Sequence, residues 1–274
     1  MYRAFNLTNL SNFDELKTID VDKARREYES NKYQVTKDLS IDNILKEAEF
    51  LQGSTEVRIN ADEIQRRIFP TYQNYDIFIS HSHKDLQLVQ KLAYYLRVNM
   101  GVKVFIDSEV WGYVDDLLLR VNNKYALKSK GLYDYTVANI DASNVYLMLS
   151  NAIHDVINAT GSLFFINTPN SLNVDSNIKS RNVESPWIYD ELKFTSTVKR
   201  RVPDYIQGYL DGFKRKIVTD SIEPPKWTRD VSKEVNGLMP LSNDTLLKWK
   251  IKSKYNSTGL SMLDFYSILY GIGI

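Results

Sequence analysis

The chain of 274 residues contains no cysteine. This absence excludes disulfides, thiolate metal sites and cysteine nucleophiles, and it fits a reducing compartment. No stretch of the sequence approaches the roughly 18 consecutive apolar residues of a membrane span, and the N-terminal segment lacks the apolar core of a signal peptide. We therefore expect a cytoplasmic protein with no membrane partner.

An excess of one charge sign is also missing, because 35 basic and 34 acidic residues leave a net charge of +1. A global field that would attract nucleic acid is therefore not expected. Basic clusters occur at residues 199–201 and 214–216. Such clusters are typical of solvated helix faces, so we expect no nucleic-acid partner.

Neither GxxxxGK nor GxGxxG occurs in the sequence. This argues against a P-loop NTPase and against a dinucleotide-type Rossmann dehydrogenase. His81 and His83 stand two residues apart beside Asp85, and the third histidine, His154, is distant. This spacing does not favour a metal site, so we expect no metal and no resident cofactor.

The composition is that of an ordinary globular protein, with 43% hydrophobic and 25% charged residues. Residues 1–70 are charged and mostly helical in pattern. Apolar residues at helical spacing follow Ser40, Asn60 with Glu63 resembles a capping box, and Pro70 ends the segment. We expect a helical N-terminal extension over residues 1–70 that packs against the next domain.

From residue 72 onward, apolar runs typical of strands alternate with helical periodicity. Strands are predicted at residues 75–80, 102–106, 144–149 and 162–166, with helices at 86–96, 113–141 and 152–159. This alternation predicts an α/β fold with an open, mainly parallel sheet and helices on both faces. The main domain is expected over residues 71–220. Residues 221–274 are expected to be a C-terminal extension whose fold the sequence does not specify, with Pro224 and Pro225 as a linker.

Residues 168–184 show little periodicity, and a loop this long inside a compact domain is typically functional or disordered. We expect it to form a lid. Ser185 as N-cap and Pro186 as the first helical residue then predict a helix start.

Ligands of open α/β sheets bind beyond the carboxyl ends of the strands. The predicted loops at those ends are residues 80–85, 107–111 and 150–151. Ser80, His81, Ser82 and His83 could present backbone amides to a phosphate at the start of the next helix. A polar loop that is merely solvated is the alternative interpretation.

Glu191 is the main candidate for chemistry. It follows Trp187 by four residues, so a helix presents the ring and the carboxylate on one face. The ring can stack on a nucleotide, and the carboxylate can stabilise positive charge at the anomeric carbon as a glycosidic bond breaks. Trp187 as a core residue remains an open alternative, and Asp190 is expected to be solvated.

Four segments, YDIFISHSHKD, KVFIDSEVWG, NVYLMLS and SPWIYDEL, resemble in this order the signature segments of a TIR (Toll/interleukin-1 receptor) domain. The match covers residues 72–200. The segments DSEVW and WIYDE are particularly similar to the TIR subunit of bacterial Thoeris antiphage systems. The resemblance implies a flavodoxin-like sheet.

The same resemblance implies an NADase, a hydrolase or cyclase that splits NAD as its substrate. By position it makes Glu191 the catalytic residue. It places the following residues against the substrate: Ser80, His81, Ser82, Asp107, Trp111 and Trp187. The implied product is an ADP-ribose-derived signalling nucleotide, such as a cyclic ADP-ribose isomer, that activates a separate effector protein in antiviral defence. A homo-oligomer and a phage-derived trigger are implied as well.

The sequence departs from the family between its third predicted strand and the tryptophan helix. We expect residues 151–184 to be an insertion that shapes the pocket, and Ile188 stands where many family members have cysteine. Two alternatives remain open. One is a non-catalytic TIR scaffold that acts by self-association, and the other is a nucleoside deoxyribosyltransferase-like enzyme, which also uses a glutamate near a sugar.

Overall fold

The computed structural model describes residues 1–31, 41–52, 56–69, 75–175, 180–201, 229–255 and 261–271. The chain divides into two compact units. The first, here called the sheet unit, comprises Met1–Ser30, Asn74–Ile106 and Ile157–Ile274. The second, here called the helix–hairpin unit, comprises Asn31–Gln73 and Asp107–Val156.

Five parallel strands form the central sheet of the sheet unit, in the order β12-β1-β8-β4-β5. Their bounds are β1 Arg3–Thr8, β4 Ile77–Ser80, β5 Val104–Ile106, β8 Ser162–Asn167 and β12 Met239–Leu241. Every residue of β4 and the first five residues of β8 are buried. Burial on both sides of a strand is typical of a parallel sheet whose two faces are both covered.

One face of this sheet packs on a continuous apolar core that contains the fully buried side chains Phe5, Ile79 and Phe164. The elements on this side are η1 Leu10–Asn12, α1 Asp14–Lys17, α2 Val21–Asn31, α5 Leu86–Met100, α11 Asn243–Tyr255 and α12 Ser261–Tyr270. Trp249 of α11 anchors the layer, because its ring centroid lies 4.5 Å from that of Phe265. The Trp249 Nε1–H also donates a hydrogen bond to the carbonyl of Ser261 at 2.8 Å.

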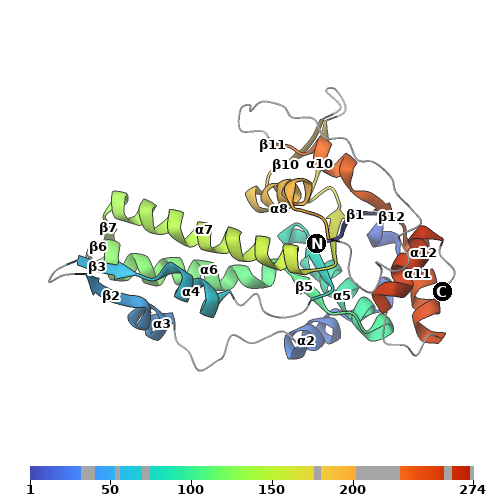
Figure 1. Cartoon of the computed structure of the whole chain (residues 1–274), viewed down its shortest axis with the longest axis horizontal. Helices are drawn as coiled ribbons and strands as arrows, with labels where there is room; N and C mark the ends of the chain where they lie inside the picture. Colours follow the sequence, from blue (N-terminus) through green and yellow to red (C-terminus); the bar gives the residue numbers. More distant parts are fainter. Residues whose placement is uncertain are drawn as a thin grey trace. The chain divides into compact units, whose positions relative to one another are not determined.

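Helix α8, Pro186–Thr197, covers the opposite face. A right-handed crossover from β8 to β12 places the intervening helix on the side away from α5, and Figure 1 shows α8 and α5 on opposite sides of the strands. The backbone N–H of Arg201 donates to the carbonyl of Met1 at 3.2 Å, so the segment after α8 reaches the edge where β1 begins. Helix α8 therefore runs antiparallel to the strands, and the α/β fold with a flavodoxin-like open sheet is confirmed.

A small antiparallel sheet adjoins α8, with the order β11-β10-β9. Its elements are β9 Asn173–Asp175, β10 Ser180–Val183 and β11 Arg229–Asp230, followed by helix α10 Ser232–Gly237. Lys193 of α8 pairs with the buried Glu234 of α10 at 3.2 Å. Arg181 of β10 donates to the side chain of Asn236 at 2.7 Å, so α10 connects α8 to the small sheet.

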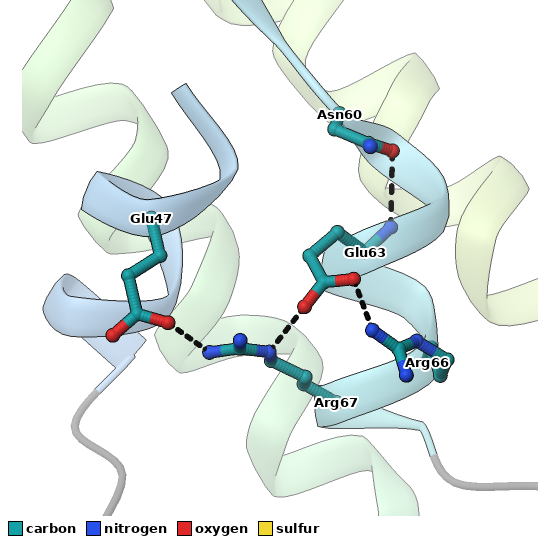
Figure 2. A network of polar contacts seen from close by, with 5 residues as sticks. All are labelled: Glu47, Asn60, Glu63, Arg66 and Arg67. Carbon is teal, nitrogen blue, oxygen red and sulfur yellow. Dashed lines mark hydrogen bonds and ion pairs between the residues drawn. The ribbon is translucent and has the colours of Figure 1, made fainter. Parts of the chain in front are cut away.

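The helix–hairpin unit combines helices with two two-stranded antiparallel sheets. Its elements are α3 Ile41–Ala48, β2 Glu49–Gln52, β3 Glu56–Ile59, α4 Ala61–Ile68, α6 Ser108–Val121, η3 Asn122–Ala126, β6 Leu127–Ser129, β7 Leu132–Tyr133 and most of α7 Tyr135–Ala159. Figure 2 shows how α3 and α4 are joined: Arg67 pairs with Glu47 and with Glu63, each at 2.5 Å. The Asn60 side chain accepts from the backbone N–H of Glu63 at 3.1 Å and caps α4, as predicted.

The prediction that residues 1–70 are helical is wrong at two places. Residues 3–8 form β1 inside the central sheet, and residues 49–52 pair with 56–59 as a hairpin. The partners of β1 are β8 and β12, which follow it by more than 150 residues in the sequence. A short strand that is stabilised by such distant pairing gives little local signal.

The predicted strand at residues 144–149 is also wrong, because these residues belong to helix α7. Val145, Met148 and Leu149 are buried, whereas Tyr146 and Leu147 are exposed. This is helical spacing, and a short apolar run cannot by itself distinguish a strand from a helix. The predicted loop at residues 150–151 consequently lies within the same helix.

The predicted insertion at residues 151–184 is not a peripheral addition, because it contains β8, the strand between β1 and β4. The expected loop at residues 168–184 contains β9 and β10, so it is not without secondary structure, and the expectation that it forms a lid stays a prediction. The C-terminal residues contribute β12, α11 and α12 to the sheet unit, and the expected linker at Pro224 and Pro225 lies outside the described residues.

Candidate active site

Three residues form one row across the central sheet near its carboxyl edge. Phe165 of β8 is the Cα partner of Asn6 on β1 and of Ser80 on β4. Because side chains alternate along a strand, all three project from the face opposite the apolar core, which is the face that α8 covers. Ser80 ends β4, so the row lies where open α/β sheets bind their ligands.

Two polar atoms in this row are buried without a hydrogen-bond partner among the described residues: Ser80 Oγ and Asn6 Oδ1. Ser80 is fully buried. Most buried polar groups in proteins are hydrogen-bonded, and leaving one unpaired costs about 1–3 kcal/mol. Two such atoms on one face, near the edge where open sheets bind ligands, need a partner such as an ordered water or a polar ligand.

Glu191 lies on the inner side of α8 and is fully buried, together with Ile188, Leu192 and Thr195. The helix begins as predicted, because Ser185 accepts a hydrogen bond from the backbone N–H of Ile188 at 3.4 Å and Pro186 follows the cap. A carboxylate is rarely buried unless it has a specific role or partner. The burial of Glu191 therefore differs from the solvent-exposed position that is usual for a glutamate on a helix.

The level of Glu191 along α8 can be compared with that of the polar row. Glu191 lies about 9 Å along the helix axis from Thr197. The four residues from Thr197 to Arg201 lengthen this distance by at most about 13 Å when fully extended. The hydrogen bond between Arg201 and Met1 marks the amino edge of the sheet, from which Asn6 lies roughly 16 Å along β1. This distance falls within the range of about 9 to 22 Å that α8 and the residues after it allow, so the chain lengths are compatible with Glu191 lying level with the polar row.

The loops that follow β4 and β8 are tied together at the carboxyl edge. The buried Asp85 accepts hydrogen bonds from the hydroxyl of Thr168 and from the side-chain amide of Asn170, the latter at 2.8 Å. The Ser171 hydroxyl donates to the carbonyl of Ile166 at 2.7 Å and holds the second loop to its strand. These bonds fix the rim of the candidate site on the side of β4 and β8.

The structure brings several of the predicted site residues into one region of the sheet unit. Ser80 and His81 are buried at the end of β4, and Ser82 is half-buried and accepts from the backbone N–H of Lys84 at 3.4 Å. Trp187 is half-buried on α8. It is therefore not fully buried in the core, and its role in stacking stays a prediction.

Asp107 and Trp111 belong to the helix–hairpin unit. Asp107 is buried and immediately precedes α6, which begins at Ser108, so the predicted loop at residues 107–111 is largely helix. The side chain of Trp111 lies outside the described residues. The roles that the sequence assigns to these two residues stay predictions.

Asn6 is the residue of the polar row that sequence reasoning missed. The segment Arg3–Thr8 reads RAFNLT, in which the apolar Phe5 and Leu7 alternate with the polar Asn6 and Thr8. This period of two is the pattern of a strand with two unlike faces. The signal was present in the sequence but extended over only a few residues.

The basic cluster at residues 199–201 has a structural contact. Arg201 donates to the backbone carbonyl and to the side chain of Asn158, both at 3.2 Å, near the end of α7. A cation at a helix C-terminus stabilises the exposed carbonyl groups there. The second cluster, at residues 214–216, lies outside the described residues.

Within the described ranges, no group of three or more histidine, cysteine, aspartate or glutamate side chains is arranged to hold a metal ion. In the same part of the chain, no helix combines the length and the apolar character that crossing a membrane requires.

In comparisons with known proteins, no protein-family model, no curated protein and no solved structure matches this chain.

Proposed function

We propose that this chain is a TIR-like enzyme that cleaves the nicotinamide glycosidic bond of NAD, with Glu191 as its catalytic residue. The observation that carries the proposal is the full burial of the Glu191 carboxylate on α8, in the same sheet unit as the buried polar row of Asn6 and Ser80. The choice of NAD as the substrate rests on the resemblance of the segments around Ser80 and Glu191 to TIR domains.

The proposed reaction needs little acid catalysis. When the bond between C1′ and the nicotinamide nitrogen breaks, the bonding electron pair moves to the positively charged ring, and nicotinamide leaves as a neutral molecule. Positive charge develops on C1′ and the ring oxygen of the ribose, where a buried carboxylate stabilises it strongly. An oxygen of water, or a nucleophile within the same molecule, then bonds to C1′ and a proton is released where the nucleophile carried one.

The product is proposed to be an ADP-ribose derivative that signals to a separate effector protein in antiphage defence. This part of the proposal derives from the similarity of the DSEVW and WIYDE segments to the TIR subunit of Thoeris systems. A cytoplasmic location, a homo-oligomeric active form and a phage-derived trigger belong to the same proposal.

The direct test compares purified wild-type protein with Glu191→Gln for NAD consumption and nicotinamide release. Glu191→Gln is expected to reduce turnover about 100-fold or more, the scale for losing one electrostatic stabiliser. Glu184→Gln is the matched control, because Glu184 is exposed and its Oε1 accepts from Asn173 at 2.9 Å, a bond that glutamine retains. Equal NAD consumption by wild type and Glu191→Gln contradicts the catalytic role of Glu191.

A second candidate, a nucleoside deoxyribosyltransferase-like enzyme, also uses a glutamate beside a sugar. Buried Glu191 is compatible with both reactions. Substrate choice separates them, because the proposed enzyme releases nicotinamide from NAD and the alternative exchanges the base of a deoxynucleoside. A third outcome, with no turnover of either substrate but concentration-dependent self-association, favours the non-catalytic scaffold.

A further inference from the structure

Helix α7 exposes large apolar side chains on the side opposite to its buried residues. Val145 and Leu149 are buried, whereas Ile140 and Leu147 are 56% and 59% exposed. The outer side of a surface helix usually carries charged residues. The 25 residues of α7 include no lysine, arginine or glutamate, and its only acidic residues are two aspartates. Depletion of charge around large apolar side chains is typical of a surface that another protein covers.

Six residues on this outer side follow the heptad spacing of a coiled coil, and they are here called the α7 seam. Along the helix, the steps between them are 4, 3, 4, 3 and 4 residues. Small and large side chains alternate in the series, which reads Thr136, Ile140, Ser143, Leu147, Ser150 and His154. The first four are exposed and the last two are partly buried. This spacing is typical of a helix that packs against another helix.

The α7 seam is complementary to a second copy of itself. When two copies of α7 lie antiparallel about a two-fold axis at the level of Val145, each large residue faces a small one. Leu147 then faces Ser143 of the partner subunit, and Ile140 faces Ser150 of the partner subunit. The same axis also pairs the two ends of the series. One symmetric arrangement therefore fits every layer of the seam.

The charge of the helix favours a copy of this chain over other kinds of partner. Like charges on the seam would repel one another in a contact between copies, and the seam carries no aspartate, glutamate, lysine or arginine. Exposed amides flank it at Asn139, Asn144 and Asn151, and an amide can both donate to and accept from an identical amide. Nucleic acid and membrane surfaces select helices rich in lysine and arginine, which α7 lacks.

We propose that the α7 seam is a homodimer interface, in which α7 of one chain packs antiparallel against α7 of a second copy. It names a surface for the homo-oligomer that the proposed function includes, and its test does not depend on NAD cleavage. The exposed residues of the seam belong to the helix–hairpin unit, whereas Glu191 belongs to the sheet unit. The interface also includes residues 144–149, which the sequence analysis assigned to a strand.

The size of the seam sets the expected strength of the dimer. A standard stable interface buries about 800 Å² per partner, and a single helix face of this length offers less. Further apolar surface is available at the start of α7, where Figure 1 shows the hairpin of β6 and β7. Leu127 and Leu132 of this hairpin are exposed. We therefore expect a reversible dimer that forms at micromolar concentrations.

Molar mass measured by sedimentation over about 1 to 100 µM tests the interface, because dimers of this strength dissociate within that range. Wild type should change from monomer to dimer. Ile140→Glu and Leu147→Glu should stay monomeric, because the seam would bury an unpaired carboxylate. Ile251→Glu is the matched control, since Ile251 is 58% exposed on α11 in the sheet unit and the replacement is the same. It should dimerise like wild type.

Cysteine cross-linking tests the antiparallel arrangement, because the chain has no cysteine of its own. Ser143→Cys and Leu147→Cys are made as separate proteins, one of them with a tag, and mixed under oxidising conditions. The two positions face each other in the proposed dimer, at a separation that a disulfide can bridge. The mixed disulfide should therefore form faster than a disulfide between two identical variants.

A wild-type protein that is monomeric over the whole concentration range overturns the inference and leaves the proposed function intact. Equal dimerisation of wild type and Ile140→Glu also overturns it, because the contact would then lie elsewhere. Faster cross-linking of Ser143→Cys with itself than with Leu147→Cys contradicts the antiparallel arrangement. A lower melting temperature of Ile140→Glu at concentrations where wild type is monomeric contradicts the exposed position of this residue. Dimers that form as expected but do not cleave NAD contradict the proposed function alone.

Discussion

The carboxylate of Asp85 accepts a hydrogen bond from the hydroxyl of Thr168, and this contact joins the loop after β4 to the loop after β8. The two strands are neighbours in the sheet but are separated by about eighty residues in the sequence. Asp85 is buried and also accepts from the side-chain amide of Asn170. A buried acceptor with two donors can hold both loops in one arrangement.

Asp85→Ala should loosen this rim. Its two donors would lose a charged acceptor, and such hydrogen bonds contribute about 1.5–3 kcal/mol each. We expect a lower free energy of unfolding in urea and a higher KM for NAD. Thr168→Ala added to Asp85→Ala should cost little more, because the shared bond is already absent. Additive losses in this double-mutant cycle would show that the two side chains do not act together.

Ser185→Ala should destabilise the helix that carries Glu191. Ser185 is the N-cap of α8, and its side chain accepts from the backbone N–H of Ile188. Replacing an N-cap serine by alanine costs about 1 kcal/mol, whereas Ser185→Asp retains an acceptor. In denaturant unfolding, wild type and Ser185→Asp should therefore both be more stable than Ser185→Ala. If all three unfold at the same denaturant concentration, the cap makes no net contribution.

Asp76 gives a prediction for pH. Burial raises the pKa of this carboxyl, although the backbone N–H of Lys103, which donates to it at 2.7 Å, and the charge of Lys103 oppose the shift. An acid whose pKa is higher in the folded state holds its proton more tightly when the protein is folded. The free energy of unfolding therefore falls as the pH rises from the pKa of the unfolded state through the pKa of the folded state.

Asp76→Asn should therefore raise the melting temperature at pH 7. The gain should disappear below about pH 3.9, the unfolded value, because Asp76 is then protonated in both states. Thermal unfolding of both proteins across this range measures the difference. A gain that stays constant with pH would show that ionisation of Asp76 is not its cause.

The N-terminal strand gives a prediction about truncation. A chain limited to residues 71–220, the domain expected from the sequence, lacks β1 and β12 and so loses two of the five strands of the central sheet. It also lacks Trp249 and Phe265, which are fully buried against the sheet. We expect this fragment to be unfolded by circular dichroism, whereas the full chain unfolds cooperatively. A fragment that melts like the full chain would contradict the assignment of β1 and β12 to the core of the fold.

Local patterns in the sequence predicted those parts of the fold whose signals are contained in a few neighbouring residues. The strands β4, β5 and β8, helix α5 and the capped start of α8 all carry such signals. The strand expected at residues 144–149 is wrong, because a short run with five apolar residues fits both a strand and one part of a 25-residue helix. Strand β1 was missed because its partners lie far along the chain.

The candidate site was predictable to the same extent. Glu191 and Ser80 stand in distinctive segments, and both prove to be fully buried. Asn6 joins them only through the register of three strands, which no local pattern reveals. Asp107 and Trp111 were grouped with the site by position in a family pattern, and they belong to the second compact unit.

The central claim is that Glu191 splits NAD. The most direct measurement is mass spectrometry of small molecules from cells that express wild type or Glu191→Gln, with and without phage challenge. The proposal predicts an ADP-ribose derivative and a fall in NAD in challenged wild-type cells, and neither change with Glu191→Gln. The same nucleotide profile in both strains under challenge would contradict it.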